Sequence, residues 1–229
     1  MFLFYITILI IDGVFMTNDK FCYIFGAAPV SAPLKFNPRP AQDFVIAADA
    51  GYNFLTQQGI KPDLLVGDLD SLGFAPSDVE LVKFPTVKDD TDMMLAINEG
   101  KKRGFNKFII YGGMGGKTEF TLANLQILSN IVNSGELCYF VGSGSLITAV
   151  KNGSLNFSEE FHGRVSVFAA GEAAHGVTLS GLKYTLTDAV LRYDCPLGVS
   201  NEFINSKGSI SVTDGMLYVI YDDCNPMFF

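Results

Sequence analysis

The pattern of apolar residues changes near residue 150, and this change limits the possible folds more than any other feature of the chain. Before it, short apolar runs alternate with segments of helical spacing. The expected strands are 20–28, 43–51, 62–68, 107–113 and 136–142. The expected helices are 52–59, 89–104 and 117–135, with a loop over 29–42 and a short element over 79–85. This alternation predicts a mainly parallel sheet with flanking helices.

The part after the change consists of short β-prone runs such as RVSVFAA and GMLYVIYDD, separated by glycine, aspartate and asparagine turns. No long helical period occurs there, which is typical of a small β-sandwich or barrel. We therefore expect an α/β fold in two domains. An α/β domain over 1–148 is followed by an all-β sandwich over 149–229.

The first 15 residues form a mostly apolar segment, for which several roles are considered. The apolar run ends at Asp12, which makes it too short to span a membrane. It has no basic start and no small-residue cleavage site, so a targeting segment fits poorly. The segment is expected to be a first strand, or an extension ahead of a start near Met16.

Charge and cysteine content limit which binding partners and which cellular compartment are expected for this protein. The 229 residues carry a net charge of −8, which argues against nucleic acid because that partner needs a basic surface. No other segment approaches the length of a membrane span. The four cysteines are scattered without a C-x-x-C pair and only two histidines occur, which disfavours zinc and favours a reducing compartment. We expect a cytoplasmic protein with no nucleic-acid or membrane partner.

Carboxylates follow several of the expected strands: Asp49, then Asp68 and Asp70, then Asp89 and Asp92. The carboxyl ends of parallel strands meet at one edge of a sheet, where ligands bind. Carboxylates held together there repel one another unless a cation lies between them. Mg²⁺ takes oxygen ligands and bridges carboxylates to phosphates. The set predicts a magnesium and phosphate site, although each segment alone is also typical of a turn or a helix cap.

The glycine run YGGMGGKTEF, residues 111–120, lies between an expected strand and an expected helix. It is not a Walker A motif, because Tyr111 stands where the first glycine of that motif is required. A glycine loop at this place can bring backbone N–H groups to a phosphate. The alternative is a loop in which glycine serves only turns and packing.

The segments ADAG, GDLDS, KDDTD, GGMGGKTEFTLANLQIL and LGVSNEF, in this order, resemble the thiamine pyrophosphokinase family. The resemblance covers about residues 20–220. It implies an α/β catalytic domain that binds ATP and Mg²⁺, and a β-sandwich that binds thiamine. It also implies transfer of a diphosphate from ATP to the hydroxyl of thiamine, and a homodimer with pockets at the subunit interface.

By motif, the resemblance also implies roles for individual residues. The catalytic residues would be Asp68, Asp70, Asp89 and Asp92, the first three also as metal ligands. The ATP contacts would be Asp49, Lys88, Thr91, Gly115, Gly116, Lys117 and Asn124. The thiamine contacts would be Ser200 and Asn201.

The chain departs from the family pattern in two places. Ala50 replaces a glycine in the first motif. Bacterial relatives usually read Gly-Gly-Arg-x-Asp-His where this chain has Lys117, Glu119 and Phe120. Lysine keeps the positive charge of the arginine without its two-pronged geometry, so the loop's contacts with ATP are expected to differ.

Two other functions remain open from the sequence. One is a related diphosphokinase acting on a pterin alcohol, against which LGVSNEF and the β domain favour thiamine. The other is a thiamine- or nucleotide-binding regulator without catalysis. The full set of carboxylates favours an enzyme over such a regulator, because binding alone needs fewer.

Overall fold

The computed structural model describes residues 8–9, 19–30, 36, 38–70, 73, 76–85, 89–142 and 144–222. It separates into two compact units. The α/β unit runs over Asp19–Ser143, and the β unit contains the described residues 144–222 together with 8–9. The expected boundary between 148 and 149 lay inside strand β8 (Ser145–Phe157), so the structural division comes a few residues earlier. The roles expected of the two units stay a prediction.

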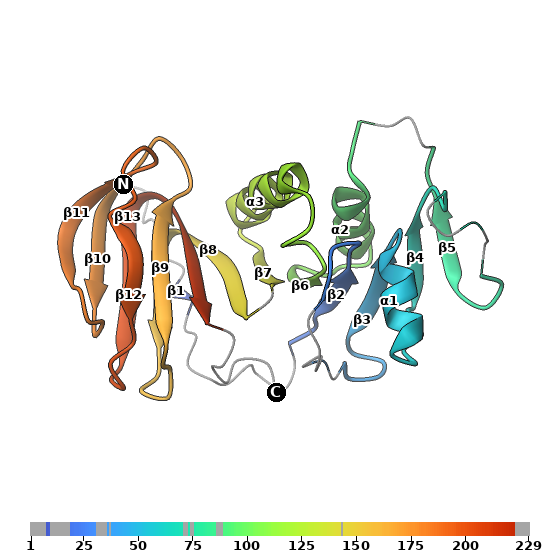
Figure 1. Ribbon diagram of the computed structural model, residues 1–229, viewed down its shortest axis with the longest axis horizontal. Coiled ribbons are helices and arrows are strands. Elements are labelled where there is room, and N and C mark those ends of the chain that lie inside the picture. Colours follow the sequence, from blue (N-terminus) through green and yellow to red (C-terminus); the bar gives the residue numbers. More distant parts are fainter. Residues whose placement is uncertain are drawn as a thin grey trace, which may run out of the picture. The chain divides into compact units, whose positions relative to one another are not determined.

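The α/β unit is built on a parallel sheet (Figure 1). Its strands follow the order β7-β6-β2-β3-β4-β5, and each hydrogen-bonds its neighbour in parallel. The bounds are β2 (Cys22–Phe25), β3 (Phe44–Ala48), β4 (Leu64–Gly67), β5 (Glu80–Lys83), β6 (Lys107–Tyr111) and β7 (Leu137–Val141). All residues of β2 and β4 are buried, as expected for central strands of a covered parallel sheet.

Three helices flank this sheet in the described residues: α1 (Gly51–Gln57), α2 (Asp92–Lys102) and α3 (Thr118–Asn133). Helix α2 begins after Thr91, whose Oγ1 accepts a hydrogen bond of 3.2 Å from the N–H of Met94. This cap explains why the helix begins later than the expected residue 89. Asp92 in the first turn and Lys102 in the last complement the helix dipole.

The packing of α2 on the sheet depends on a small residue. A Cβ at Gly100 would lie 2.9 Å from the Phe108 ring and 3.0 Å from Cys22 Sγ. The helix therefore approaches β2 and β6 more closely than any larger residue permits. Because α2 is held this close, the residues at its N-terminus reach the carboxyl edge of the sheet.

The β unit consists of antiparallel strands around the long strand β13 (Gly208–Asp222), apart from β1, which pairs with β8 in parallel (Figure 1). Strand β8 pairs with β13, which also pairs with β10 through its first half and with β9 through its second. The remaining bounds are β1 (Ile8–Leu9), β9 (Arg164–Ala169), β10 (Ala173–Ser180), β11 (Leu186–Arg192) and β12 (Gly198–Glu202). The expected fold class, α/β with an all-β C-terminal part, is confirmed.

Aromatic side chains fill the core of the β unit. The rings of Phe157, Phe161, Phe203 and Tyr221 form one cluster, with centroid distances of 5.1–6.0 Å.

Within the described residues, none of the helices has both the length and the apolar character that a membrane span requires.

Candidate active site

The carboxyl ends of four neighbouring strands form the edge of the sheet that carries the candidate site. Phe25 is in register with Tyr111, and Ala48 with Val66. The N–H of Asp49 donates a 2.8 Å hydrogen bond to the carbonyl of Val66. Because the register aligns these ends, the residues that follow β2, β3, β4 and β6 converge on one edge.

Two glycines allow the ends of β2 and β6 to touch. The N–H of Gly26 donates to the Tyr111 carbonyl at 2.8 Å, and the N–H of Ala28 donates to the Gly112 carbonyl at 2.9 Å. Gly112 has φ +64°, and a Cβ there would lie 2.4 Å from the Gly26 carbonyl oxygen. Only glycine satisfies both conditions. This close approach forms the floor of a cavity.

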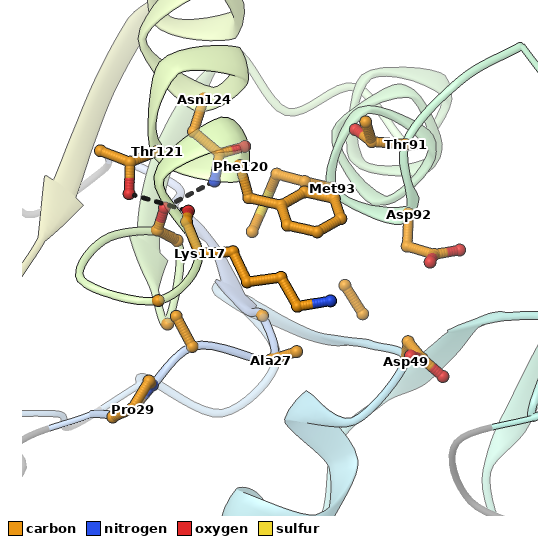
Figure 2. Close-up of a pocket in the computed structure, with 16 residues that line it drawn as sticks. Ala27, Pro29, Asp49, Thr91, Asp92, Met93, Lys117, Phe120, Thr121 and Asn124 are labelled. Atoms are coloured by element: carbon orange, nitrogen blue, oxygen red, sulfur yellow. Dashed lines mark hydrogen bonds between the residues drawn. The ribbon is translucent and has the colours of Figure 1, made fainter.

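The cavity has a volume of about 440 Å³ and lies within the α/β unit (Figure 2). Its wall includes six residues that the sequence assigned to ATP binding or catalysis. They are Asp49, Thr91, Asp92, Gly116, Lys117 and Asn124. The volume is in the range of small-molecule sites. The structure thus gathers residues that lie up to 75 positions apart in the sequence, from Asp49 to Asn124.

Lys117 and Phe120 line the cavity at the start of α3. Figure 2 shows the Lys117 side chain extending into the cavity. Its Nζ lies 5.9 Å from the centre of the Phe120 ring, and this ring is 51% exposed. At an exposed site such a cation–π contact contributes about 0.5 kcal/mol. Lys117 therefore remains available to an anionic ligand at small cost.

Asn124 is a nearly buried polar residue of the cavity wall. Its side chain is 5% exposed, and its Nδ2 donates a 2.6 Å hydrogen bond to the Gly113 carbonyl. A carbonyl can only accept, so the amide nitrogen must face Gly113. The bond ties α3 to the glycine loop and thereby sets the position of the cavity wall.

Asp68 and Asp70 form a turn after β4. Asp68 Oδ1 accepts a 3.0 Å hydrogen bond from the N–H of Asp70, and Leu69 between them has φ +69°. These two residues and Asp89 are not among those that line the cavity. In the described part of the chain, no three His, Cys, Asp or Glu side chains form a group that could hold a metal ion. The metal ligands stay a prediction.

Two of the expected ATP contacts are not found in the cavity wall as described. Lys88 falls outside the described residues. Gly115 has φ +78° and does not line the cavity, and a Cβ there would meet no atom within 4 Å. Glycine is favoured at this position because of its positive φ, and not because a side chain would lack room.

The expected thiamine residues lie on β12. Ser200 is exposed with φ +58°, and its N–H donates to Ser166 Oγ at 3.0 Å. Asn201 is 3% exposed; its Oδ1 accepts from the Tyr184 N–H at 2.9 Å and its Nδ2 donates to the Tyr184 carbonyl at 2.6 Å. The Asn201 amide therefore holds the backbone of Tyr184, whose own side chain is 59% exposed.

Sequence reasoning missed several residues of the cavity wall, among them Phe120, Thr121 and Met93. The helical spacing of Met93 is typical of a core residue, and it is also buried in the structure. The one available signal for Phe120 was its place in the glycine-loop motif, where relatives usually carry histidine. For Thr121 the sequence offered no signal.

The fold and the cavity define a class of protein before any comparison is made. It is an α/β protein with a small-molecule site at the carboxyl edge of a parallel sheet, joined to an all-β unit. The site offers carboxylates, a lysine and glycine backbone, which are the groups that bind metal and phosphate.

Two family models match the chain and identify its family. The model described as thiamin pyrophosphokinase, catalytic domain matches residues 40–140. The model described as thiamin pyrophosphokinase, vitamin B1 binding domain matches residues 154–217. The two matches together span well over half of the chain and follow its division into two units. The chain belongs to the thiamine pyrophosphokinase family.

The chain is also similar to individual proteins of this family. The thiamine pyrophosphokinase of Bacillus subtilis (strain 168) is 28% identical over 185 residues, which are 76% of this chain and 85% of that protein. A crystal structure of the B. subtilis protein matches with a TM-score of 0.78 at 24% identity, covering 89% of this chain and 99% of that one. The yeast enzyme matches at 0.74 and 16% identity, covering 93% and 89%. These structural matches show the fold.

Proposed function

We propose that the cavity of the α/β unit is where this protein binds ATP for the thiamine diphosphokinase reaction. As a member of the family, the protein is an ATP-dependent diphosphotransferase. It transfers a diphosphate from ATP to the hydroxyl of thiamine and yields thiamine diphosphate and AMP. One observation supports placing ATP in this cavity. Its wall contains five residues that the motifs assign to ATP, namely Asp49, Thr91, Gly116, Lys117 and Asn124.

Mg²⁺ is proposed to be held by Asp68, Asp70 and Asp89. The donor set fits this ion, because hard cations take carboxylate oxygens. Asp68 and Asp70 directly follow β4, which pairs with β3, and Asp49 directly follows β3. When bound, the metal would neutralise charge on the phosphate oxygens. The same carboxylates that repel one another without a cation would then be stabilised together.

The chain's own residues supply positioning and charge. The Lys117 ammonium can balance a phosphate, and the glycine loop offers backbone N–H groups close to it. Thr91 fixes the start of α2 and so fixes the Asp92 carboxylate at the cavity wall. A carboxylate at this edge can accept the proton of the attacking hydroxyl. Most of the rate should come from orientation, because a primary alcohol must be aligned with the β-phosphorus.

Thiamine is proposed to contact the β unit near Ser200 and Asn201. The Asn201 amide is engaged with the Tyr184 backbone, so its effect on thiamine would be exerted through the position of Tyr184. An exposed aromatic ring suits a flat cationic ligand such as thiamine. In this proposal Asn201 is a positioning residue and Tyr184 a candidate contact.

A homodimer is proposed because the β unit exposes large apolar side chains. Between residues 184 and 204 they are Tyr184, Val190, Tyr193, Leu197, Val199 and Ile204. A monomer seldom exposes so many within one segment, and a twofold partner is the commonest way to cover them. A cytoplasmic location is also proposed, since free Cys22, Cys138 and Cys195 among the described residues suit a reducing compartment.

The activity is tested by product analysis with ATP, Mg²⁺ and thiamine. Release of AMP together with thiamine diphosphate is expected. Release of ADP would show transfer of a single phosphate and refute the proposed reaction. A parallel reaction with a pterin alcohol separates the related diphosphokinase, and binding of ATP and thiamine without either product would support the regulator.

The metal ligands are tested by Asp70→Asn, with Asp90→Asn as the matched control. Asp90 is an exposed carboxylate next to the proposed ligand Asp89, and it has no assigned role. Asp70→Asn should stay folded by circular dichroism and lose at least about a hundredfold in turnover, the scale of one key electrostatic contact. Asp90→Asn should keep near-normal turnover. Equal turnover of both variants would contradict the assignment of Asp70.

A further inference from the structure

We propose that the purine base of ATP binds at the part of the cavity formed by Phe120, Met93 and Asn124, and that Asn124 Oδ1 selects adenine over guanine. This inference rests on the proposed function, because it places one part of the ATP used there. The family motifs assign Asn124 to ATP without saying which part of ATP it contacts, and the inference adds that it reads the base.

Phe120 offers a surface for a flat ring. It lines the cavity from the first turn of α3, yet half of its side chain remains exposed. A large apolar group in such a place loses contact with water when a ligand covers it. Aromatic side chains stack on bases without sequence preference, because every base has a π-face. Phe120 is thus the cavity's natural platform for a base.

Met93 provides an apolar wall from α2. It is 7% exposed, lines the cavity, and its Cε packs over the backbone of Gly26. A methionine adapts its shape to a ring and makes favourable sulfur–aromatic contacts. Phe120 and Met93 come from different helices, so together they can bound a flat ligand that neither helix could hold alone.

Asn124 provides the polar group that would distinguish adenine from guanine. Its Nδ2 faces the Gly113 carbonyl, so its Oδ1 is left as the group for a ligand. Within the residues that the structure describes, this oxygen accepts no hydrogen bond, although the side chain is nearly buried. The exocyclic amine of adenine can donate to it. The O6 oxygen of guanine is an acceptor and would oppose it.

The carboxylates of the cavity are separated from Asn124, while the Lys117 Nζ lies 5.9 Å from the centre of the Phe120 ring. Figure 2 shows Asp49 and Asp92 toward one side of the cavity and Asn124 and Thr121 toward the other. An acceptor such as Asn124 Oδ1 disfavours a phosphate beside it. The phosphates would therefore lie toward Lys117 and the carboxylates with their metal, and the base toward Asn124.

Tryptophan fluorescence tests the placement of the base. The chain has no tryptophan, so Phe120→Trp creates its only one. Leu122→Trp is the matched control, because Leu122 is 59% exposed on the same helix and does not line the cavity. ATP and adenosine should quench Phe120→Trp, while tripolyphosphate and thiamine should not, and Leu122→Trp should respond to none of them.

Three other outcomes would overturn the placement of the base. Equal quenching of Phe120→Trp by tripolyphosphate would place phosphate at this residue. Quenching by thiamine and not by adenosine would place the other substrate there. No response at ATP concentrations that saturate turnover would remove Phe120 from the base site. If quenching by ATP occurs but the unsubstituted protein releases no AMP from ATP and thiamine, the reaction fails while the base site stands.

Selectivity tests Asn124 separately. The measured quantity is the ratio of kcat/KM for ATP to that for GTP, in which a general loss of stability cancels. Asn124→Ala should lower this ratio about tenfold, the scale of one buried hydrogen bond. Asn130→Ala, the same substitution at an exposed position of α3, should leave it unchanged. An unchanged ratio in Asn124→Ala would show that Asn124 does not read the base.

Discussion

Single residues in this protein act through the partners that the fold gives them. Asn124 and Asn201 are both nearly buried amides, and each binds a backbone carbonyl through Nδ2. The oxygen of Asn201 is also used, since it accepts from two backbone N–H groups. The oxygen of Asn124 is left toward the cavity. The same residue type is therefore structural in one unit and a candidate ligand contact in the other.

Asp43 shows how a buried charge is stabilised near the start of the sheet. Its side chain is 1% exposed, and it accepts hydrogen bonds of 2.8–2.9 Å from the Arg39 backbone and guanidinium and from the Phe21 N–H. Burial raises the pKa of this carboxyl, but the hydrogen bonds from Arg39 and Phe21 outweigh it. The net pKa lies below its ordinary value of 3.8. The folded state thus favours the ionised form.

Asp43→Asn is expected to lower the free energy of unfolding by about 2 kcal/mol at pH 7, since bonds to a charged acceptor are lost. Because the pKa of Asp43 is lowered on folding, this contribution is complete above pH 3.8. It is lost as the pH falls through the lower pKa of the folded state. Urea unfolding of both proteins at neutral and acid pH measures the difference, which should shrink on acidification.

The control for this prediction is Asp78→Asn. The pKa of Asp78 is also lowered, first by a hydrogen bond and then by charge attraction from Lys61. Both side chains of this pair are mostly exposed, and exposed ion pairs contribute little to stability. Asp78→Asn should have no measurable effect on unfolding. A loss as large as that of Asp43→Asn would show that burial does not decide the difference.

At the scale of elements, the junction of β2 and β6 sets the site. The chain must turn away from both strands at Gly26 and Gly112, in contact with each other. The glycine loop that follows β6 then reaches α3 at Lys117. Any change that separates the two strand ends should therefore disturb both the stability of the sheet and the cavity wall.

Gly112→Ala and Gly115→Ala form a matched pair that tests this junction. Both residues have positive φ, so each alanine carries similar conformational strain of about 1 kcal/mol. A Cβ at Gly112 would also lie 2.4 Å from a backbone oxygen, whereas at Gly115 it meets open space. In urea unfolding, Gly112→Ala should therefore lose at least about 3 kcal/mol. Similar losses in both variants would rule out close packing as the reason for Gly112.

At the scale of the whole molecule, the proposed homodimer determines which chains form a site. In the proposed homodimer, each site combines carboxylates of one chain with the Ser200 and Asn201 region of the other. The exposed apolar side chains of the β unit are then covered by the partner. Activity would require the dimer, and the two halves of a site could be inactivated on separate chains.

Complementation tests this arrangement. Asp70→Asn and Asn201→Ala, each impaired alone, should regain turnover when mixed under conditions of subunit exchange. Random pairing gives half heterodimers with one intact site each, so about a quarter of the wild-type rate is expected. Mixing Asp68→Asn with Asp70→Asn is the control, and it should restore nothing. An active monomer in light scattering, or no recovery despite proven exchange, would contradict the shared site.

Much of the fold could be predicted from the sequence because it is encoded locally. Apolar runs marked the strands of the α/β unit, and the loss of helical spacing near residue 150 marked the all-β part. Helix α2 was expected, although its start was placed at residue 89 and not after the Thr91 cap. The order of motifs along the chain was sufficient for the family. These features depend on near neighbours in the chain, so one sequence contains them.

Only the tertiary structure decided which side chains meet. Phe120 belongs to the cavity because α3 turns that face toward the ends of β2 and β3, and helical spacing alone cannot say so. Asn201 binds Tyr184 because an isolated β-bridge between Leu182 and Phe203 brings residues 17 positions apart together. Strand register and helix packing fix such contacts through interactions between distant parts of the chain. The sequence determined the elements and the chemistry at their ends, and packing determined which of those groups share a site.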